Sequence, residues 1–278
     1  MSGLLLALDT STERTTVGVA RLERDVPIVL ASCEVDAPRA AMSRVLPSVA
    51  DLLEELSALI SDVSAVIVGR GPGSFTGVRI GVATAKGLAH GLAVPLWGVG
   101  TLDAIAWGVA AAHADSAAFT LAVVGDAMRG EIYPALFDCH GGRALRRHGD
   151  RVAKPTAVVE EWGAPDEPLV LAGNGLRKYA DVLLGGLGET ATVADESLWA
   201  PTAAGLFAAW AEARLSGMLG SSDPGELLPV YTRLSDAEEN ERTRAGLDLG
   251  RTPGSGVAGS APVADDGGAT HGPAGVTR

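Results

Sequence analysis

The chain has 278 residues, of which 47% are hydrophobic and 4% aromatic, and its formal net charge is −12. This apolar content excludes wholesale disorder, and the length fits one large domain or two modest ones. The acidic balance disfavours a stand-alone nucleic-acid binder and a protein drawn to an anionic membrane surface, because both carry negative charge.

The two cysteines, Cys33 and Cys139, belong to no CxxC or Cys/His cluster, so the sequence predicts no zinc site. Residues 1–8 carry no basic region and are not typical of a signal peptide. The apolar stretch 91–112 is interrupted by Pro95 and Asp103, which favours a strand, a loop and a helix over a membrane span. We therefore expect a cytoplasmic protein with reduced thiols.

The first hundred residues predict three closely spaced strands, followed by alternating helices and strands. Continuous apolar runs predict buried strands, and apolar residues at helical spacing predict helices. The short polar connections between the first three strands are typical of an antiparallel meander. The predicted strands are Leu4–Leu8, Thr15–Arg21, Ile28–Glu34, Val63–Val68 and Val94–Val99, and the predicted helices are Ala41–Ile60 and Val78–His90.

The rest of the chain echoes this order weakly, because LALDTSTERTTVGVARL and LAVVGDAMRGEIYPALF both run from an apolar strand through an Asp turn into a second strand. A duplicated α/β lobe is therefore expected, with a first lobe at 1–101 and a second at 102–245. The predicted strands are Thr120–Val124, Glu131–Asp138, Arg143–Arg147 and Leu169–Ala172, and the predicted helices are Leu102–Ala114, Thr156–Trp162, Leu176–Leu184 and Thr202–Leu219.

The last segment, 246–278, differs in composition from everything before it. It contains nine glycines, three prolines and no aromatic residue. Such a segment cannot bury enough apolar surface to offset its chain entropy, so we predict a disordered tail.

The most informative motif is a glycine-rich block between a predicted strand and a predicted helix. It is neither a Walker A loop nor a G-x-G-x-x-G fingerprint. Backbone N–H groups at the start of the helix could cradle an anion, but a rigid turn that shapes a protein-binding surface is preferred. Ser74 or Thr76 could cap the helix. The block comprises Gly69, Arg70, Gly71, Pro72, Gly73, Ser74, Phe75, Thr76, Gly77 and Arg79.

Small residues recur at four-residue spacing in the helix that follows the block. Gly81, Ala85 and Ala89 share one face of this helix. Such a row permits the close approach of another element, which is either this chain's own sheet or a helix of a partner protein. The spacing leaves both alternatives open.

Complete catalytic sets are missing from the sequence. The turn Asp9-Thr10-Ser11 follows the first strand and could hold a metal–phosphate group, but an Asp in such a turn usually bonds the local backbone. Asp126 could supply a second acid if the two lobes faced each other. The five histidines include no pair at helical metal-site spacing, and no G-x-S-x-G motif occurs.

A basic island at His140–Lys154 stands out in this acidic chain. It contains five Lys and Arg residues against one Asp. A solvated hairpin is the preferred interpretation. The alternative is contact with an RNA backbone through Arg143, Arg146 and Arg147.

Three segments of the chain resemble the TsaB (YeaZ) family: LALDTST near the N-terminus, the block Val68–Ala89, and the late PVYTR at Pro229–Arg233. The resemblance covers about Leu4 to Arg233 and leaves the tail outside it. It implies an α/β ASKHA (actin/Hsp70-like) fold with two related RNase H-like lobes.

The resemblance also implies a role as a non-catalytic dimerisation subunit in tRNA threonylcarbamoyladenosine (t6A) formation. The implied partners are a TsaD-like catalytic subunit, a TsaE-like ATPase and, through the complex, tRNA; a homodimer is left open for the chain alone. ATP and a metal are implied for the partner subunits and no cofactor for this chain. Family pairing through two N-terminal helices implies an interface that includes Val45, Val49, Leu53, Val78, Gly81, Val82, Ala85 and Ala89.

One departure from the family concerns the start of the first helix, where relatives often carry a His before Leu-Pro and this chain has Val45 before Leu46-Pro47. Two other functions remain as alternatives. The first is an ASKHA-fold ATPase or kinase with its own nucleotide site, and the second is a metallopeptidase-like enzyme, against which the missing His pair counts.

Overall fold

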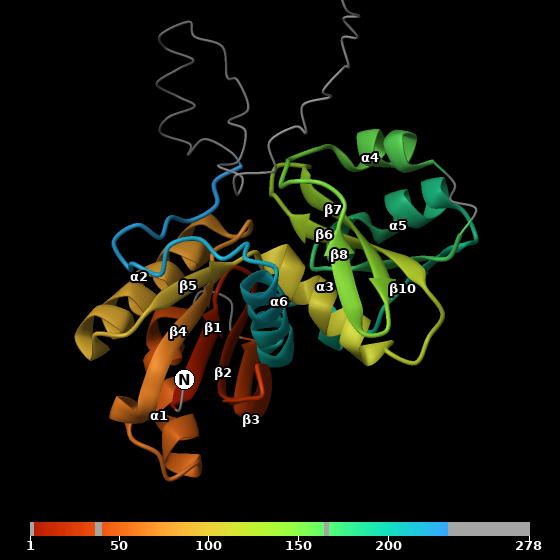
Figure 1. Ribbon diagram of the computed structural model, residues 1–278. Coiled ribbons are helices and arrows are strands. Elements are labelled where there is room, and N and C mark those ends of the chain that lie inside the picture. Colours follow the sequence, from red (N-terminus) through yellow and green to blue (C-terminus); the bar gives the residue numbers. More distant parts are fainter. Residues whose placement is uncertain (1–2, 37–40, 164–166, 233–278) are drawn as a thin grey trace, which may run out of the picture.

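Two five-stranded sheets, one in each half of the chain, form the framework of the molecule (Figure 1). The computed structural model describes residues 3–36, 41–163 and 167–232, so the predicted tail at 246–278 lies outside the described residues. The strands of the first sheet are β1 (Leu4–Asp9), β2 (Arg14–Glu23), β3 (Val26–Asp36), β4 (Val63–Gly69) and β5 (Leu96–Val99).

The first sheet has the spatial order β3-β2-β1-β4-β5. β1, β2 and β3 are antiparallel neighbours, which confirms the predicted meander, and β4 and β5 run parallel to β1. Leu5, Leu6, Ala7 and Leu8 are all fully buried. A strand that is covered on both faces needs apolar side chains on both, and this explains its unbroken apolar run.

The second sheet repeats this plan. Its order β10-β9-β6-β7-β8 places an antiparallel meander on one side of β6 and two parallel strands on the other, as around β1. The duplicated α/β architecture with RNase H-like lobes is thereby confirmed. The strands are β6 (Phe119–Asp126), β7 (Ile132–His140), β8 (Arg143–Arg146), β9 (Leu169–Ala172) and β10 (Ala191–Val193).

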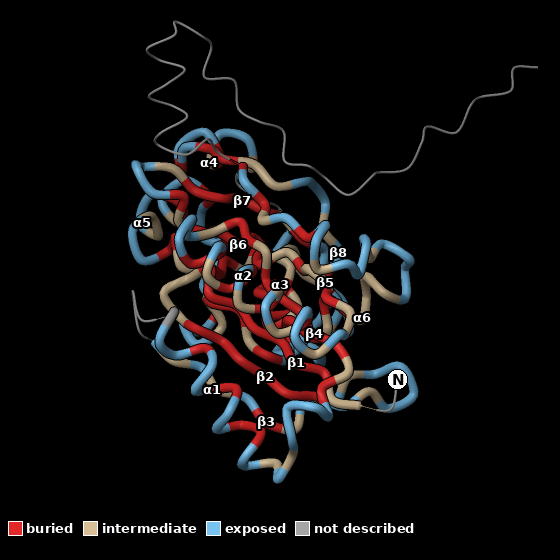
Figure 2. The backbone as a smooth tube through the Cα atoms, turned by 90° about the vertical axis from the view of Figure 1, so that its left-hand side faces the viewer, coloured by how far each residue is buried: buried red, intermediate tan, exposed pale blue. Residues whose placement is uncertain are grey.

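Helices cover both faces of the first sheet. α1 (Ala41–Glu55) and α2 (Phe75–Leu92) pack on the face that carries Leu6 and Leu8, while α6 (Ala203–Leu215) packs on the opposite face against Leu5 and Ala7. Figure 2 shows β1 and β2 buried between these layers. We call this sheet with its helices the first lobe.

The second sheet is covered in the same two-sided way and forms the second lobe. α3 (Thr101–Ala112) packs on the face that carries Leu121 and Val123. α4 (Pro155–Trp162) and α5 (Leu176–Leu187) pack on the face that carries Ala122 and Val124.

The chain returns to the first lobe after completing the second sheet. α6 contacts the strands of the first sheet, Leu96 N donates to Ser222 O, and Leu227 joins the core beneath α1 and α2. The lobe boundaries at residues 101 and 245 stay predictions. No helix of the described part of the chain is long and apolar enough to span a membrane.

Most predicted elements are confirmed, with shifted ends. α1 ends at Glu55 instead of Ile60, because Ser57 takes a left-handed conformation (φ 52°) and Ile60–Asp62 forms a separate 3-10 turn. α2 begins at Phe75, three residues before the predicted start, because Ser74 caps it by accepting a hydrogen bond from Gly77 N. The short strand β10 was not predicted from the sequence.

Candidate functional site

The two motif segments of the first lobe meet at one edge of its sheet. β1 and β4 run parallel and pair side by side, so their carboxyl ends emerge together. The turn Asp9-Thr10-Ser11 leaves β1 there, and the glycine-rich block leaves β4 and leads into α2. The contacts between these segments determine what the motif can do.

The Asp9 carboxylate lies at the centre of a buried network of hydrogen bonds. Asp9 and Ser11 are no more than 1% exposed, as is Thr101 at the start of α3. Ser11 N donates to Asp9 Oδ1 over 2.7 Å, and Thr101 Oγ1 donates to Asp9 Oδ2 over 2.8 Å. Burial raises the pKa of Asp9, although the hydrogen bonds from Ser11 and Thr101 act in the opposite direction.

The glycines of the block are required because the Asp9 turn packs directly against them. A Cβ at Gly69 would collide with the Asp9 carboxylate, one at Gly73 with Ser11 O, and one at Gly77 with Thr10 O. The absence of side chains at these positions lets the two loops interlock.

Backbone amides of the block donate their hydrogens within this interlocked structure. Ser74 N donates to Ser11 O over 2.7 Å, Gly71 N donates to Thr101 Oγ1 over 3.1 Å, and Gly77 N donates to the Ser74 side chain. An anion would have to displace these bonds to use the same amides. The geometry therefore supports the rigid-turn interpretation over the anion cradle.

Asp126 occupies the equivalent turn of the second lobe, in a different setting. It lines a cleft of about 410 Å³ with Glu13, Asp36, Asn174, Arg177 and Lys178, drawn from both lobes. Its carboxylate pairs with Lys178, and its N–H donates to the Asn174 side chain. No contact joins Asp126 to Asp9 among the described residues, and the pair of acids considered from the sequence is not formed.

The predicted interface residues of α1 and α2 turn out to pack inward. Ala85, Val45 and Ala89 are at most 1% exposed, and a Cβ on Gly81 would press against the Thr10 side chain. Their side chains fill this chain's own core, and this corrects their assignment to a contact with a partner. For the row that contains Gly81, the spacing had left open whether it faces this chain's own sheet or a partner, and the structure places it against the sheet. The corrected residues are Val45, Val49, Leu53, Val78, Gly81, Val82, Ala85 and Ala89.

The arginines of the basic island are all paired with acids. Arg143 pairs with Glu212 and Arg147 with Asp138, both at the surface. Arg146 is largely enclosed, lies over the Phe137 ring, and pairs with Asp103 and Asp150. The island is thus a charge-balanced hairpin, and Arg146 is a structural residue.

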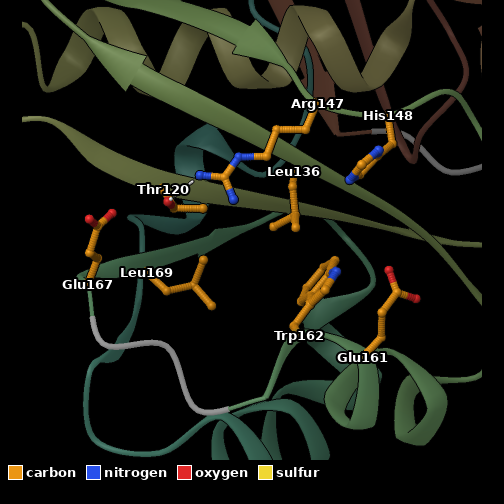
Figure 3. A pocket seen from close by; sticks show the side chains of 8 residues that line it. All are labelled: Thr120, Leu136, Arg147, His148, Glu161, Trp162, Glu167 and Leu169. Carbon is orange, nitrogen blue, oxygen red and sulfur yellow. Dashed lines mark hydrogen bonds between the residues drawn. The ribbon is translucent and has the colours of Figure 1, made fainter.

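A second cavity, of about 490 Å³, borders this hairpin (Figure 3). Leu136, Leu169 and Trp162 supply apolar walls, and Arg147 crosses one side, where it donates to Thr120. Glu161, which also lines the cavity, pairs with Arg151. The cavity lies in the second lobe and includes no residue of the interlocked motifs.

Two contacts in the first lobe were not foreseen from the sequence. Thr101 joins the Asp9 network although it is far from both motifs in sequence, and no local pattern marks it. Arg79 of the block stacks on Phe75 and bonds Tyr231, which belongs to the late PVYTR segment. In the described part of the chain, no group of three or more His, Cys, Asp or Glu residues is arranged to hold a metal ion.

Comparison with known proteins gives consistent matches. Residues 35–193 match the family described as TsaD: tRNA N6-adenosine threonylcarbamoyltransferase. The tRNA threonylcarbamoyladenosine biosynthesis protein TsaB of Escherichia coli is 36% identical over 179 residues, which cover 64% of this chain and 74% of that protein. TsaB of Bacillus subtilis is 29% identical, with 84% of this chain and 96% of that protein covered.

A solved structure and a further relative agree with these matches. YeaZ from Pseudomonas aeruginosa superposes with a TM-score of 0.66 at 32% identity, covering 82% of this chain and 99% of that chain. An uncharacterized protein of Mycobacterium tuberculosis is 33% identical over 240 residues, covering 84% of this chain and 93% of its own length.

Proposed function

This chain belongs to the TsaB (YeaZ) family, and on that premise we propose that it takes part in t6A biosynthesis as a non-catalytic scaffold subunit. It would act with a TsaD-like catalytic subunit and a TsaE-like ATPase on tRNA, to form threonylcarbamoyladenosine at the adenosine 3′ of the anticodon. The observation that carries the scaffold role is the buried Asp9 network.

The network supports this role because polar groups that could take part in catalysis are used instead for hydrogen bonds inside the protein. Asp9 is the motif acid best placed to hold a metal–phosphate group, yet both of its oxygens accept hydrogen bonds from Ser11 and Thr101. The amides that could receive a phosphate already donate within the protein, Ser74 N to Ser11 O, Gly71 N to Thr101 Oγ1 and Gly77 N to the Ser74 side chain. A motif used in this way fixes where α2 begins, and α2 then presents a defined outer surface.

That outer surface is the proposed contact with the catalytic subunit. On α2, Ala83 and Gly87 point outward, and a Cβ on Gly87 would meet nothing within 4 Å. On the neighbouring α1, Leu46 is 52% exposed and Ala50 is also exposed. Small outward residues permit close approach of a partner helix, whose apolar side chains would cover Leu46.

An ASKHA-fold ATPase or kinase is the competing function, and the cleft between the lobes is where it would act. Glu13 and Asp126 in that cleft are paired with Arg177 and Lys178. The Glu13–Arg177 pair joins the two lobes across this cleft, and the Asp126–Lys178 pair, within the second lobe, occupies charged groups that line it. They favour the scaffold role over nucleotide turnover.

Reconstitution with the TsaD-like and TsaE-like proteins of the same organism tests the proposal directly. We expect the chain to co-purify with the TsaD-like protein and to be required for t6A formation on tRNA. Alone, it should neither modify tRNA nor hydrolyse ATP. Robust ATP turnover by the isolated chain, lost in Glu13→Gln, would favour the competing function.

A matched pair of substitutions on α2 tests whether its outer surface contacts the catalytic subunit. Ala83→Leu adds bulk to the exposed face and Ala85→Leu adds the same bulk to the core side. Overpacking typically costs about 1–3 kcal/mol, or roughly 5- to 150-fold in affinity at about 1.4 kcal/mol per decade. Ala83→Leu should weaken pairing by that factor at an unchanged melting temperature, whereas Ala85→Leu should lower the melting temperature. Undiminished pairing of Ala83→Leu would contradict the outer-face contact.

A further inference from the structure

Arg79 is held rigidly on the surface although it is exposed. Its guanidinium carbon lies 3.8 Å from the centre of the Phe75 ring and 5.7 Å from that of Tyr231. Its Nε donates to Tyr231 Oη over 3.0 Å. Stacking and a hydrogen bond together fix the plane of a side chain that normally samples many rotamers.

The terminal nitrogens of this guanidinium have no acidic partner among the described residues. Most other arginines of the described residues do pair with an acid; for example, Arg14 pairs with Asp36, Arg177 with Glu13, and Arg214 with Asp25. Because Nε is occupied by Tyr231, the two Nη groups form the open end of the fork. That end matches the two oxygens of a carboxylate.

The position of Arg79 connects this fork to the outer face of α2. Arg79, Ala83 and Gly87 follow one another at four-residue spacing, and all three are exposed. A helix that lay along the small residues would bring its side chains to Arg79 at the amino-terminal end of α2. The helix dipole is positive at that end and also favours an anionic group.

We infer that Arg79, clamped by Phe75 and Tyr231, is a preformed receptor for an aspartate or glutamate side chain of the protein that docks on α2. This inference rests on the proposed function, since it assigns one polar contact within that docking surface. The clamp removes rotamer freedom before binding, so less entropy is lost when the carboxylate arrives. Arg79 then fixes the register of the partner helix.

Pairing with the TsaD-like protein, measured by titration calorimetry, tests this inference. The variants are Arg79→Gln, Arg79→Lys and, as control, Arg24→Gln, at an exposed arginine of the β2–β3 turn. Charge-assisted bonds are worth about 1.5–3 kcal/mol, so Arg79→Gln should weaken pairing roughly 10- to 150-fold. Arg79→Lys should recover little of this, because an ammonium lacks the planar fork. Arg24→Gln should bind as the wild type does.

The outcomes separate this inference from the proposed function. If the wild-type chain does not bind the TsaD-like protein, the proposed function fails. If the wild type binds and Arg79→Gln binds equally well, only the receptor is overturned. A lower melting temperature of Arg79→Gln with unchanged affinity would show a purely structural clamp, and full recovery in Arg79→Lys would exclude recognition by the fork.

Reversing the charges on both sides of the contact identifies the acidic side chain of the partner that Arg79 binds. Arg79→Glu should abolish pairing, and replacing the contacting carboxylate of the partner by lysine should restore it. Failure of every acidic position on the partner's docking face to restore pairing would overturn the receptor.

Discussion

The turns after β1 and β6 occupy the same position in two lobes of the same topology, yet they are built differently. Asp9 is completely buried and is held by Ser11 and Thr101. Asp126 lines the cleft between the lobes and is paired with Lys178. An equivalent acid is thus a fully buried hydrogen-bond acceptor in one lobe and, in the other, a partly buried carboxylate paired with a lysine in the cleft.

The loops that face these turns differ accordingly. In the second lobe, Gly173 and Gly175 lie against the backbone of Val124, and α5 starts directly after them. In the first lobe, the longer block from Gly69 to Ser74 closes over the Asp9 turn before α2 begins. Topology therefore does not determine which lobe carries a rigid surface; the extra loop and its buried acid do.

The largest expected effect comes from breaking the interlock in the first lobe. Gly77→Ala would place a Cβ against Thr10 O, so we expect a loss of about 3 kcal/mol in the free energy of unfolding. Gly87→Ala in the same helix meets open space and should stabilise the protein by up to about 1 kcal/mol. Urea denaturation of both variants measures this. Equal stabilities would mean that the interlock is not tight.

Replacing each acid by alanine tests the contrast between the two turns. Asp9→Ala leaves Ser11 N and Thr101 Oγ1 without their buried acceptor, and should cost about 2 kcal/mol. Asp126→Ala removes a more exposed ion pair, and should cost less than about 1 kcal/mol. A larger loss for Asp126→Ala in chemical denaturation would reverse the roles assigned to the two turns.

The pH dependence sharpens this distinction. Burial raises the pKa of Asp9 above 3.8, its ordinary value. Between 3.8 and the raised value, the folded protein keeps a proton that the unfolded chain releases, so this group's contribution to stability falls as pH rises through that window. The stability of wild type minus that of Asp9→Asn should therefore decrease with rising pH. A difference that is flat with pH would contradict the raised pKa.

Sequence patterns predicted the elements well and the site only in part. Continuous apolar runs located nearly every strand, because burial on both faces of each sheet leaves a strong signal in residues such as Leu5 and Leu6. Whether the small-residue row faced inward could not be decided, because Ala83 and Ala85 are chemically alike and only packing separates them. Thr101 was invisible, since its role depends on a contact that long-range folding creates.

Neighbouring arginines of the basic island provide a smaller test, within the second lobe. Arg146 is enclosed with Asp103 and Asp150, so Arg146→Ala should cost about 1–2 kcal/mol, the usual penalty for a buried pair being reduced by its partial exposure. Arg147→Ala removes one surface pair, and should cost less than about 0.5 kcal/mol. Thermal denaturation of the two variants should rank them in this order, and equal losses would contradict the structural role of Arg146.

The smallest effect concerns the two thiols, one in each lobe, and changes reactivity more than stability. Cys33 on β3 is partly exposed, whereas Cys139 on β7 is buried in the core of the second lobe. Burial, reinforced by the charge of Asp138, raises the pKa of Cys139 to about 12. Only thiolates react with alkylating agents, so iodoacetamide at pH 8 should modify one site in the folded protein and two in urea. Above pH 9.0 the unfolded thiol ionises while the folded one stays protonated, so this group's contribution to stability declines as pH rises toward 12. Intact-mass analysis after alkylation counts the modified sites, and rapid double modification of the native protein would show that the second lobe opens around β7 far more readily than its packing suggests.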